Sequence, residues 1–199
     1  MKNYLTWLKQ NWAHTGLVLS IYLTIFLFAF VKDQDQTLFL LLMTIPLYMI
    51  HQTEEYIFPG GFAKFFNLDI FKARCADAPM GTQFIFCINI LYIWILLPVF
   101  GILASYNYSF GLWMSYFFLF AGVGHIALGI KAKKKYNPGL VVSCLINIPY
   151  GIYLVYYLYQ KSLLMNPWMN IHMLIGLGLN LILPVIGVIM YKNYQKTLK

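Results

Sequence analysis

Long apolar stretches dominate this sequence and limit what it can fold into. A helix needs about 17–25 predominantly apolar residues to cross a hydrocarbon core of ~30 Å. Six such stretches occur, at 15–31, 37–58, 82–104, 110–130, 140–159 and 168–191. With 61% hydrophobic and 10% charged residues, the chain also differs from soluble domains, for which roughly 45–50% and ~25% are usual. The sequence therefore predicts an all-α, polytopic membrane protein, a compact bundle of six transmembrane helices forming one domain over residues 1–199.

The basic residues are distributed unevenly between the two sides of this predicted bundle. Twelve of the fourteen lysine and arginine residues lie at the two termini and in the second and fourth connections, and the remaining connections hold only Lys32 and Lys161. Because positively charged loops stay on the cytoplasmic side, we expect a multi-pass protein of the cell membrane with both termini in the cytoplasm. The lipid bilayer is then the expected partner. Nucleic acid is not, because the basic residues are dispersed at helix ends and form no nucleic-acid-binding motif.

The second connection, from Pro59 to Gly81, is longer than the others. Its apolar residues recur near helical spacing, which predicts a short amphipathic helix over about 61–74 in the cytoplasmic interface; they are Phe62, Phe65, Phe66, Ile70 and Phe71. Such a helix either anchors the chain in the membrane or forms a lid or lipid-access element over a site. Arg74 and Lys72 could close over an anionic substrate head group, or could simply follow the positive-inside rule.

Four ionisable side chains stand inside predicted spans, where such groups are costly and by default mark function. They are His51, Glu54, Glu55 and His125. His51 lies eight residues before Pro59 and His125 six residues before Lys131. At 1.5 Å per residue, both histidines stand roughly 9–12 Å inside the cytoplasmic ends of helices that run in the same direction. We therefore expect the two histidines to lie at similar depth and to be able to meet.

The spacing of His51 and the two glutamates suits a metal site. On a helix, residues three and four apart share a face, so His51 can stand over either Glu54 or Glu55. Together with His125 they would form a mixed nitrogen and oxygen site for zinc, iron or manganese, with an open position for water or substrate. The glutamate that is not a ligand could then act as general base. The alternative is structural: a solvated carboxylate pair at a helix end and a histidine that hydrogen-bonds a glutamate.

A turn on the same side of the predicted bundle adds a further candidate element. Residues 136–139 read Tyr-Asn-Pro-Gly, and proline and glycine favour a turn here. The helix that follows can offer free N–H groups to an anion. Tyr136, Asn137 and Gly139 are thus candidate substrate-binding residues, although a plain helix start explains them equally.

Three short motifs in the middle of the chain resemble those of a known family. They are HQTEE at His51 to Glu55, the histidine of GHIALG at His125, and YNPG at Tyr136 to Gly139. Together they resemble the signature of the HXXEE-motif family of bacterial membrane proteins. The resemblance implies functional roles for His51, Glu54, Glu55, His125 and residues 136–139. It also implies a membrane-bound metalloenzyme, without naming a substrate.

These observations lead to one main hypothesis about function and two alternatives. The main hypothesis is a metal-dependent membrane enzyme, a hydrolase acting on a lipid or other apolar substrate at the cytoplasmic leaflet. The first alternative is a small six-helix transporter, or the substrate-binding membrane subunit of a larger one, which needs a cavity that reaches the bilayer midplane. The second is a structural or regulatory membrane protein with no such site, in which the four ionisable side chains would point apart. The sequence carries no signal for an oligomeric state.

Overall fold

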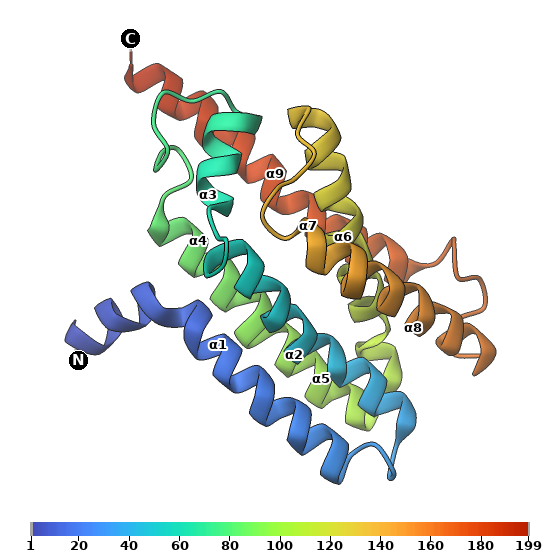
Figure 1. Cartoon of the computed structure of the whole chain (residues 1–199). Coiled ribbons are helices and arrows are strands. Elements are labelled where there is room, and N and C mark those ends of the chain that lie inside the picture. The colour runs from blue at the N-terminus through green and yellow to red at the C-terminus, as the bar shows by residue number, and fades with distance from the viewer. Residues whose placement is uncertain (1, 199) are drawn as a thin grey trace.

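The computed structural model describes residues 2–198, which excludes the two end residues of the predicted 1–199 domain. Within this range all regular secondary structure is helical, as predicted, and the only strand-like feature is an isolated bridge between Cys75 and Ala78. The long helices lie side by side in a slanted bundle (Figure 1). Their bounds are α1 Lys2–Phe30, α2 Gln36–Tyr56, α6 Leu112–Ala132 and α9 Ile171–Thr197.

Two further rods consist of consecutive helical segments. The first joins α4 Thr82–Asn89, the π-helical segment η2 Ile90–Leu96 and α5 Leu97–Tyr106, and a short turn, η3 Tyr108–Phe110, leads from it to α6. The second joins α7 Leu140–Val142, the π-helical segment η4 Ser143–Asn147 and α8 Ile148–Gln160. Each rod occupies one predicted span, so all six apolar stretches fold as helical rods.

Five of these six rods are long and apolar enough to cross a membrane, and they cover residues 4–30, 82–106, 108–132, 140–160 and 171–197. The sixth, α2, is not among them, which differs from the six spans expected. The physical reason lies in its position. Helix α2 packs against α1, α5 and α6, and its inward faces carry polar residues that the protein buries: Thr44, His51, Gln52, Glu54 and Glu55. A helix surrounded by other helices can carry such groups, because protein rather than lipid contacts them.

Large apolar side chains cover much of the outer surface of the bundle on α1 and α9. Helix α9 turns large apolar side chains outward along most of its length, including Leu174, Leu181, Val185 and Ile189. Helix α1 does the same with Ile21, Ile25 and Phe26. In water such a surface would be costly, since large exposed apolar patches are rare on soluble proteins. The described helices therefore fit a multi-pass protein in a lipid bilayer.

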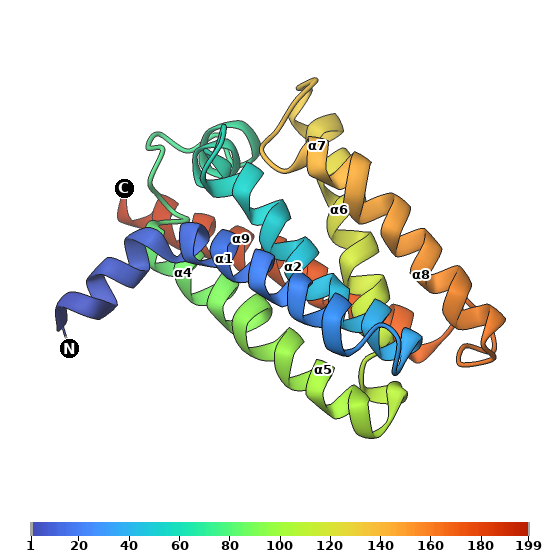
Figure 2. The ribbon, with the colours of Figure 1, turned by 60° about the horizontal axis from the view of Figure 1, so that its bottom comes forward.

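Consecutive rods run in opposite directions, so their connections gather at two ends of the bundle. Figures 1 and 2 show both chain ends at the same end as α3 and the turn before α7. We call this end, with segments 57–81 and 133–139, the basic end, because the sequence places most lysines and the arginine there and at the termini. The other connections, 31–35, 107–111 and 161–170, lie at the opposite end.

Residues 57–81, which we call the lid segment, fold back over the basic end of the bundle. A short helix, α3 Phe62–Lys64, continues into the π-helical turn η1 Phe65–Ile70. The rings of Phe62, Phe65 and Phe66 are buried and pack against Trp12, Met80 and neighbouring apolar side chains. The Asn67 side chain donates to Ala76 and Met80 carbonyls and accepts from Met80 N, which closes the segment on itself. Its aromatic face is therefore turned into the protein.

Candidate metal centre

The last two turns of α2 bring His51 and Glu55 onto one face. The two residues are one helical turn apart, and Glu55 Oε1 lies 3.6 Å from His51 Nε2. The His51 side chain is fully buried and packs against the edge of the Tyr48 ring, with ring centroids 5.3 Å apart. Within the described residues no group hydrogen-bonds His51 Nδ1, so packing and the contacts of Nε2 orient this imidazole.

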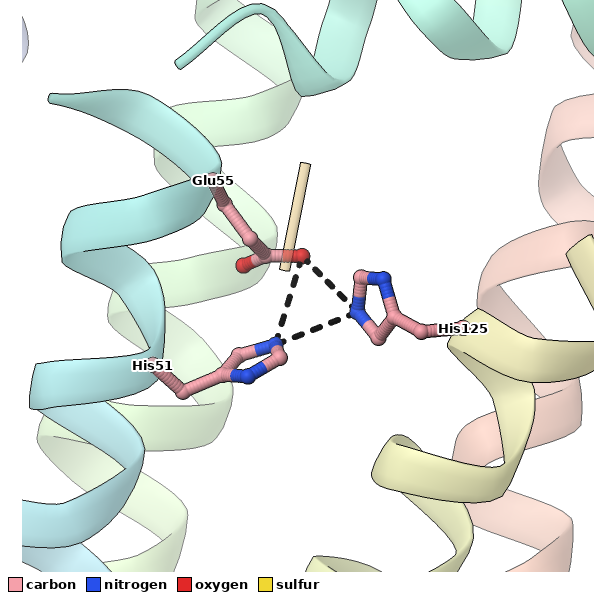
Figure 3. A group of neighbouring side chains, drawn as sticks. All are labelled: His51, Glu55 and His125. Atoms are coloured by element: carbon pink, nitrogen blue, oxygen red, sulfur yellow. Dashed lines mark hydrogen bonds and ion pairs between the residues drawn. The ribbon is translucent and has the colours of Figure 1, made fainter. Parts of the chain in front are cut away.

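Helix α6 supplies the third member of the cluster. His125 Nε2 lies 3.1 Å from His51 Nε2 and 3.3 Å from Glu55 Oε1. Figure 3 shows both imidazoles and the carboxylate converging on one point, with the second Glu55 oxygen on the side away from His125. All three side chains are buried. The expected meeting of His51 and His125 is thus confirmed, and Glu55 joins them.

The three converging atoms have the spacing of ligands on one metal ion. Tetrahedral zinc holds nitrogen and oxygen ligands at about 2.0–2.2 Å, which places neighbouring ligand atoms roughly 3.3–3.5 Å apart. The three observed distances between His51 Nε2, His125 Nε2 and Glu55 Oε1 are 3.1, 3.3 and 3.6 Å, which lie on both sides of that spacing. Among the described residues, this is the one group of three or more histidine, cysteine or acidic side chains close enough to share an ion. Two imidazoles and one carboxylate leave a fourth position open.

Asn137 fixes the orientation and the tautomer of His125. Its Nδ2 donates to the His125 carbonyl oxygen at 2.9 Å, so its Oδ1 is the atom that faces His125 Nδ1, also at 2.9 Å. An amide oxygen only accepts, and His125 Nδ1 must therefore carry a hydrogen. In the neutral ring, Nε2 is then an unprotonated lone pair aimed at His51 and Glu55. Metal-binding histidines are held by a partner of this kind on the second ring nitrogen.

Gly139 allows the loop to approach His125. Its φ is +97°, a left-handed conformation that side chains other than glycine rarely adopt. A Cβ atom at this position would lie 2.4 Å from His125 Cε1, so any side chain would displace the ring. Asn137 and Gly139 thus hold the imidazole of His125 from two sides.

Glu54, one of the two glutamates considered as a metal ligand, lies outside the cluster of His51, Glu55 and His125. Its Oε2 accepts from Val142 N at 2.7 Å, and its Oε1 accepts from Val141 N at 3.1 Å and from the Tyr136 hydroxyl at 3.0 Å. The helix start after Gly139 therefore does offer N–H groups to an anion, as expected, but the anion is Glu54 itself. Adjacent residues on a helix do not share a face, and Glu54 consequently joins α2 to α7 while Glu55 faces α6.

Tyr136 takes part in this link and not in the cluster. Partial burial, together with the hydrogen bond to Glu54, raises the pKa of the Tyr136 hydroxyl to about 12. A phenol that donates to a carboxylate is favoured in its protonated form. Tyr136 and Asn137 therefore use their polar groups on Glu54 and His125.

Arg74 is not brought to the cluster. It is exposed on the lid segment and lines an open depression together with Lys72 and the end of α9, including Tyr191, Lys192 and Lys196. This basic depression lies at the basic end of the bundle, but neither Glu55 nor a histidine contributes to its walls.

An apolar cleft leads to the cluster, and the sequence did not reveal most of its walls. The cleft has a volume of about 320 Å³, and Glu55 and His125 line it together with Tyr48, Phe62 and Phe66. Phe62 also contacts His125 directly, with ring centroids 5.8 Å apart. Tyr48 could have been found from its spacing, because it stands one turn before His51 on α2. Phe62 could not, since no local pattern shows where the lid segment folds.

Comparison with known proteins is consistent with these residues forming the centre of the molecule. A family model described as "Protein of unknown function with HXXEE motif" matches residues 42–154, more than half of the chain. The chain belongs to this family. The matched region contains α6 and most of α2, and with them His51, Glu54, Glu55, His125 and the turn at 136–139. No curated protein and no solved structure matches the chain.

Proposed function

We propose that this HXXEE-family protein is a membrane-embedded, metal-dependent enzyme, a hydrolase that acts on a lipid or another apolar substrate. His51, Glu55 and His125 hold the ion, which is zinc, iron or manganese by the hardness of the donors. The convergence of His51 Nε2, His125 Nε2 and Glu55 Oε1, all within 4.8 Å of one another, carries this proposal.

The charge balance of the cluster supports a cation. A buried carboxylate needs hydrogen-bond donors, as Glu54 has, or an opposite charge, because an isolated ionised group loses its hydration. In the described part of the chain, the ion pairs of Glu55 are with His51 and His125 alone, and no lysine or arginine reaches it. Two neutral imidazoles and one carboxylate leave a net negative charge, which a divalent ion compensates.

The residues suggest how such a site would work. A bound divalent ion would supply Lewis-acid chemistry, polarising a carbonyl group or lowering the pKa of water. Asn137 holds His125 with its Nε2 lone pair toward His51 and Glu55, and Glu55 would hold the ion through Oε1. The second oxygen of Glu55, which lies on the side away from His125 (Figure 3), would serve as general base for the nucleophile. This role falls to Glu55 because both oxygens of Glu54 already accept hydrogen bonds from α7 and Tyr136.

We further propose that all six rods, α2 included, cross the cell membrane with both termini in the cytoplasm. Support comes from the excess of lysine and arginine at the basic end, since basic loops stay inside. Helix α2 has 21 residues and is thus about 31 Å long, enough to span. Glu55 is the second-last residue of α2, so the cluster would lie near the cytoplasmic leaflet.

Elemental analysis of the purified protein tests the metal centre. We expect about one transition metal ion per chain in the wild type, and none in His51→Ala or Glu55→Ala. A wild type without stoichiometric metal would overturn the proposal. The metal-loaded protein is then incubated with bilayers of bacterial lipids, and mass spectrometry of the lipids tests for hydrolysis. Metal-dependent movement of a lipid between leaflets without cleavage would instead favour the transporter alternative.

A further inference from the structure

Helices α6 and α9 approach each other closely at Gly176 of α9. A Cβ atom there would lie 2.6 Å from Phe117 N on α6, so the two backbones touch. One turn further along α9, Asn180 Nδ2 donates to the Phe117 carbonyl oxygen at 3.0 Å. This contact holds the two helices together on the side of the cluster that is farther from the basic end.

Beyond this contact, toward the basic end, the apolar cleft lies between the same two helices. Its walls come mainly from α6 and α9, and Phe62 and Phe66 of the lid segment close one side. The apolar lining residues include Ala121, Leu128, Leu177 and Leu183. Glu55 and His125 of the cluster also line this cleft, so the proposed ion site is reached through an apolar passage.

The outer lips of the cleft belong to the apolar exterior of the bundle. Val123 on α6 is 43% exposed and Leu181 on α9 is 52% exposed. Gly124, which also lines the cleft, has open space where a side chain would be, since none of the described atoms lies within 4 Å of the position that a Cβ would take. The cleft thus opens sideways, on a face that meets lipid if the bundle is in a membrane.

These walls suit a hydrocarbon chain better than a polar solute. Polar groups on the lining are confined to a few residues, namely Tyr48, Glu55, His125 and Asn180. A polar molecule would have to leave water and cross the lipid to reach such an opening, which is costly. The cleft volume is at the lower end of the roughly 300–1,000 Å³ of small-molecule sites, so it suits one chain and not a whole two-chain lipid.

We infer that the cleft between α6 and α9 binds a single hydrocarbon chain of a membrane lipid, which enters sideways from the bilayer and brings its polar end to His51, Glu55 and His125. This inference rests on the proposed function and names the substrate class of that site as acyl-chain lipids. Lipid tails are as apolar as the cleft walls, so no hydrophobic gain drives the chain out of the bilayer. Binding is therefore weak and exchange fast, which suits a substrate that is abundant in the membrane.

Two glycines offer a matched pair of variants for the test. Gly124→Phe places a ring in the cleft, whereas Gly178→Phe places one on the exposed surface of α9, where a Cβ atom also has no neighbour within 4 Å and no wall of the cleft is touched. Ala127→Phe, on the α6 side of the cleft, is a second blocking variant in case Gly124→Phe does not fold.

The probe is a phosphatidylglycerol with a diazirine on one acyl chain, incorporated with each protein into lipid nanodiscs and photolysed. We expect labelling of the cleft residues Leu128 and Leu177 in the wild type and in Gly178→Phe. In the blocking variants this labelling should fall to the background level, while Leu174 on the outer surface stays labelled. Unchanged labelling of Leu128 and Leu177 in the blocking variants, or a protein–protein cross-link across the cleft in place of lipid, would overturn the inference.

Metal content, measured on the same preparations, separates this inference from the proposed function. Wild-type protein that holds metal but shows no labelling within the cleft refutes the acyl-chain site and leaves the metal centre standing. Cleft labelling that the blocking variants abolish, in a protein without metal, supports the chain-binding site and refutes the metal centre. Blocking variants that keep their metal and lose only the labelling support both.

Discussion

Glu54 and Glu55 are adjacent in sequence, similarly buried, and opposite in environment. Glu54 is surrounded by donors: two backbone N–H groups of the rod that begins with α7, and the hydroxyl of Tyr136. Among the described residues no backbone group donates to Glu55, which lies beside His51 on its own helix and meets His125 across the gap to α6. A carboxylate whose lone pairs are occupied by N–H and O–H groups has the environment of a structural link. One that converges with other lone pairs has the environment of a ligand.

The difference follows from the geometry of α2. Consecutive residues on a helix point in different directions, so two neighbouring acids at its end reach two different partners. Glu54, on the side of α2 that faces α7, links the loop at 136–139 to α2. That link positions Asn137 and Gly139, which in turn hold His125. The structural glutamate therefore supports the site that the other glutamate joins, although Glu54 does not enter it.

We expect the largest effect, on metal content, when each of the two glutamates is replaced in turn by glutamine. Glu55→Gln removes a charged ligand, and we expect bound transition metal to fall from about one ion per chain to a trace, by more than the 10–100-fold typical of a residue that only supports a ligand. Glu54→Gln is the matched control and should retain the metal. Equal metal loss in both variants would show that the distinction between the two glutamates is wrong.

The next effect concerns stability. In Glu54→Gln an amide N–H₂ replaces one carboxylate oxygen and faces a backbone N–H, and hydrogen bonds to a charged group are lost, which costs about 2–3 kcal/mol. For a chain of this size we expect Tm to fall by roughly 4–12 °C, measured by intrinsic fluorescence in detergent with excess metal. Glu55→Gln, compared without added metal, should fall less. A Glu54→Gln protein as stable as the wild type would remove the structural role.

The sequence predicted part of this site. It did not predict the contacts that depend on how each helix is rotated about its own axis. The helices followed from their apolar lengths, and the meeting of His51 with His125 followed from depth along helices that run in the same direction. The sequence did not show whether Glu54 or Glu55 joins the histidines, because residues three and four positions after His51 both lie near its face of the helix. Only the packing of α6 and α7 around α2 decides between the two glutamates. For the same reason, the hydrogen bond from His125 to Asn137 could not be read from a turn motif.

Other differences arise from surroundings that a linear pattern does not contain. The amphipathic spacing at 61–74 indicates an apolar face, and only the fold shows that Phe62 and Phe66 turn it onto the protein. Helix α2 matches the other apolar stretches in length, but the structure shows that its polar groups are accommodated by neighbouring helices. In both cases tertiary packing determines what the local composition means.

A smaller effect on metal affinity should distinguish Asn137, which supports His125, from the ligands themselves. Asn137→Ala leaves all three ligand atoms in place but removes the partner of His125 Nδ1. We expect metal affinity to fall 10–100-fold, as is usual for such a partner, in competition titrations with a chromogenic chelator. Asn137→Asp, which keeps an acceptor for that nitrogen, should retain more of the affinity. If Asn137→Ala binds metal as tightly as the wild type, the tautomer of His125 is set by something else.

The smallest effect lies at the edge of the Glu54 link. Tyr136→Phe removes one of three hydrogen bonds to Glu54, from a hydroxyl that is partly exposed, and should cost about 1 kcal/mol near neutral pH without changing metal content. The pKa of this hydroxyl is raised to about 12, above the ~10 of an unfolded tyrosine. Its contribution to stability is therefore fully present below pH 10 and is lost as the pH rises toward 12. The difference in Tm between wild type and Tyr136→Phe should accordingly narrow between pH 10 and 12, because the phenylalanine does not titrate. A difference that stays constant over that interval would mean that the hydroxyl does not donate to Glu54, and that the two backbone N–H groups alone hold this carboxylate away from the cluster.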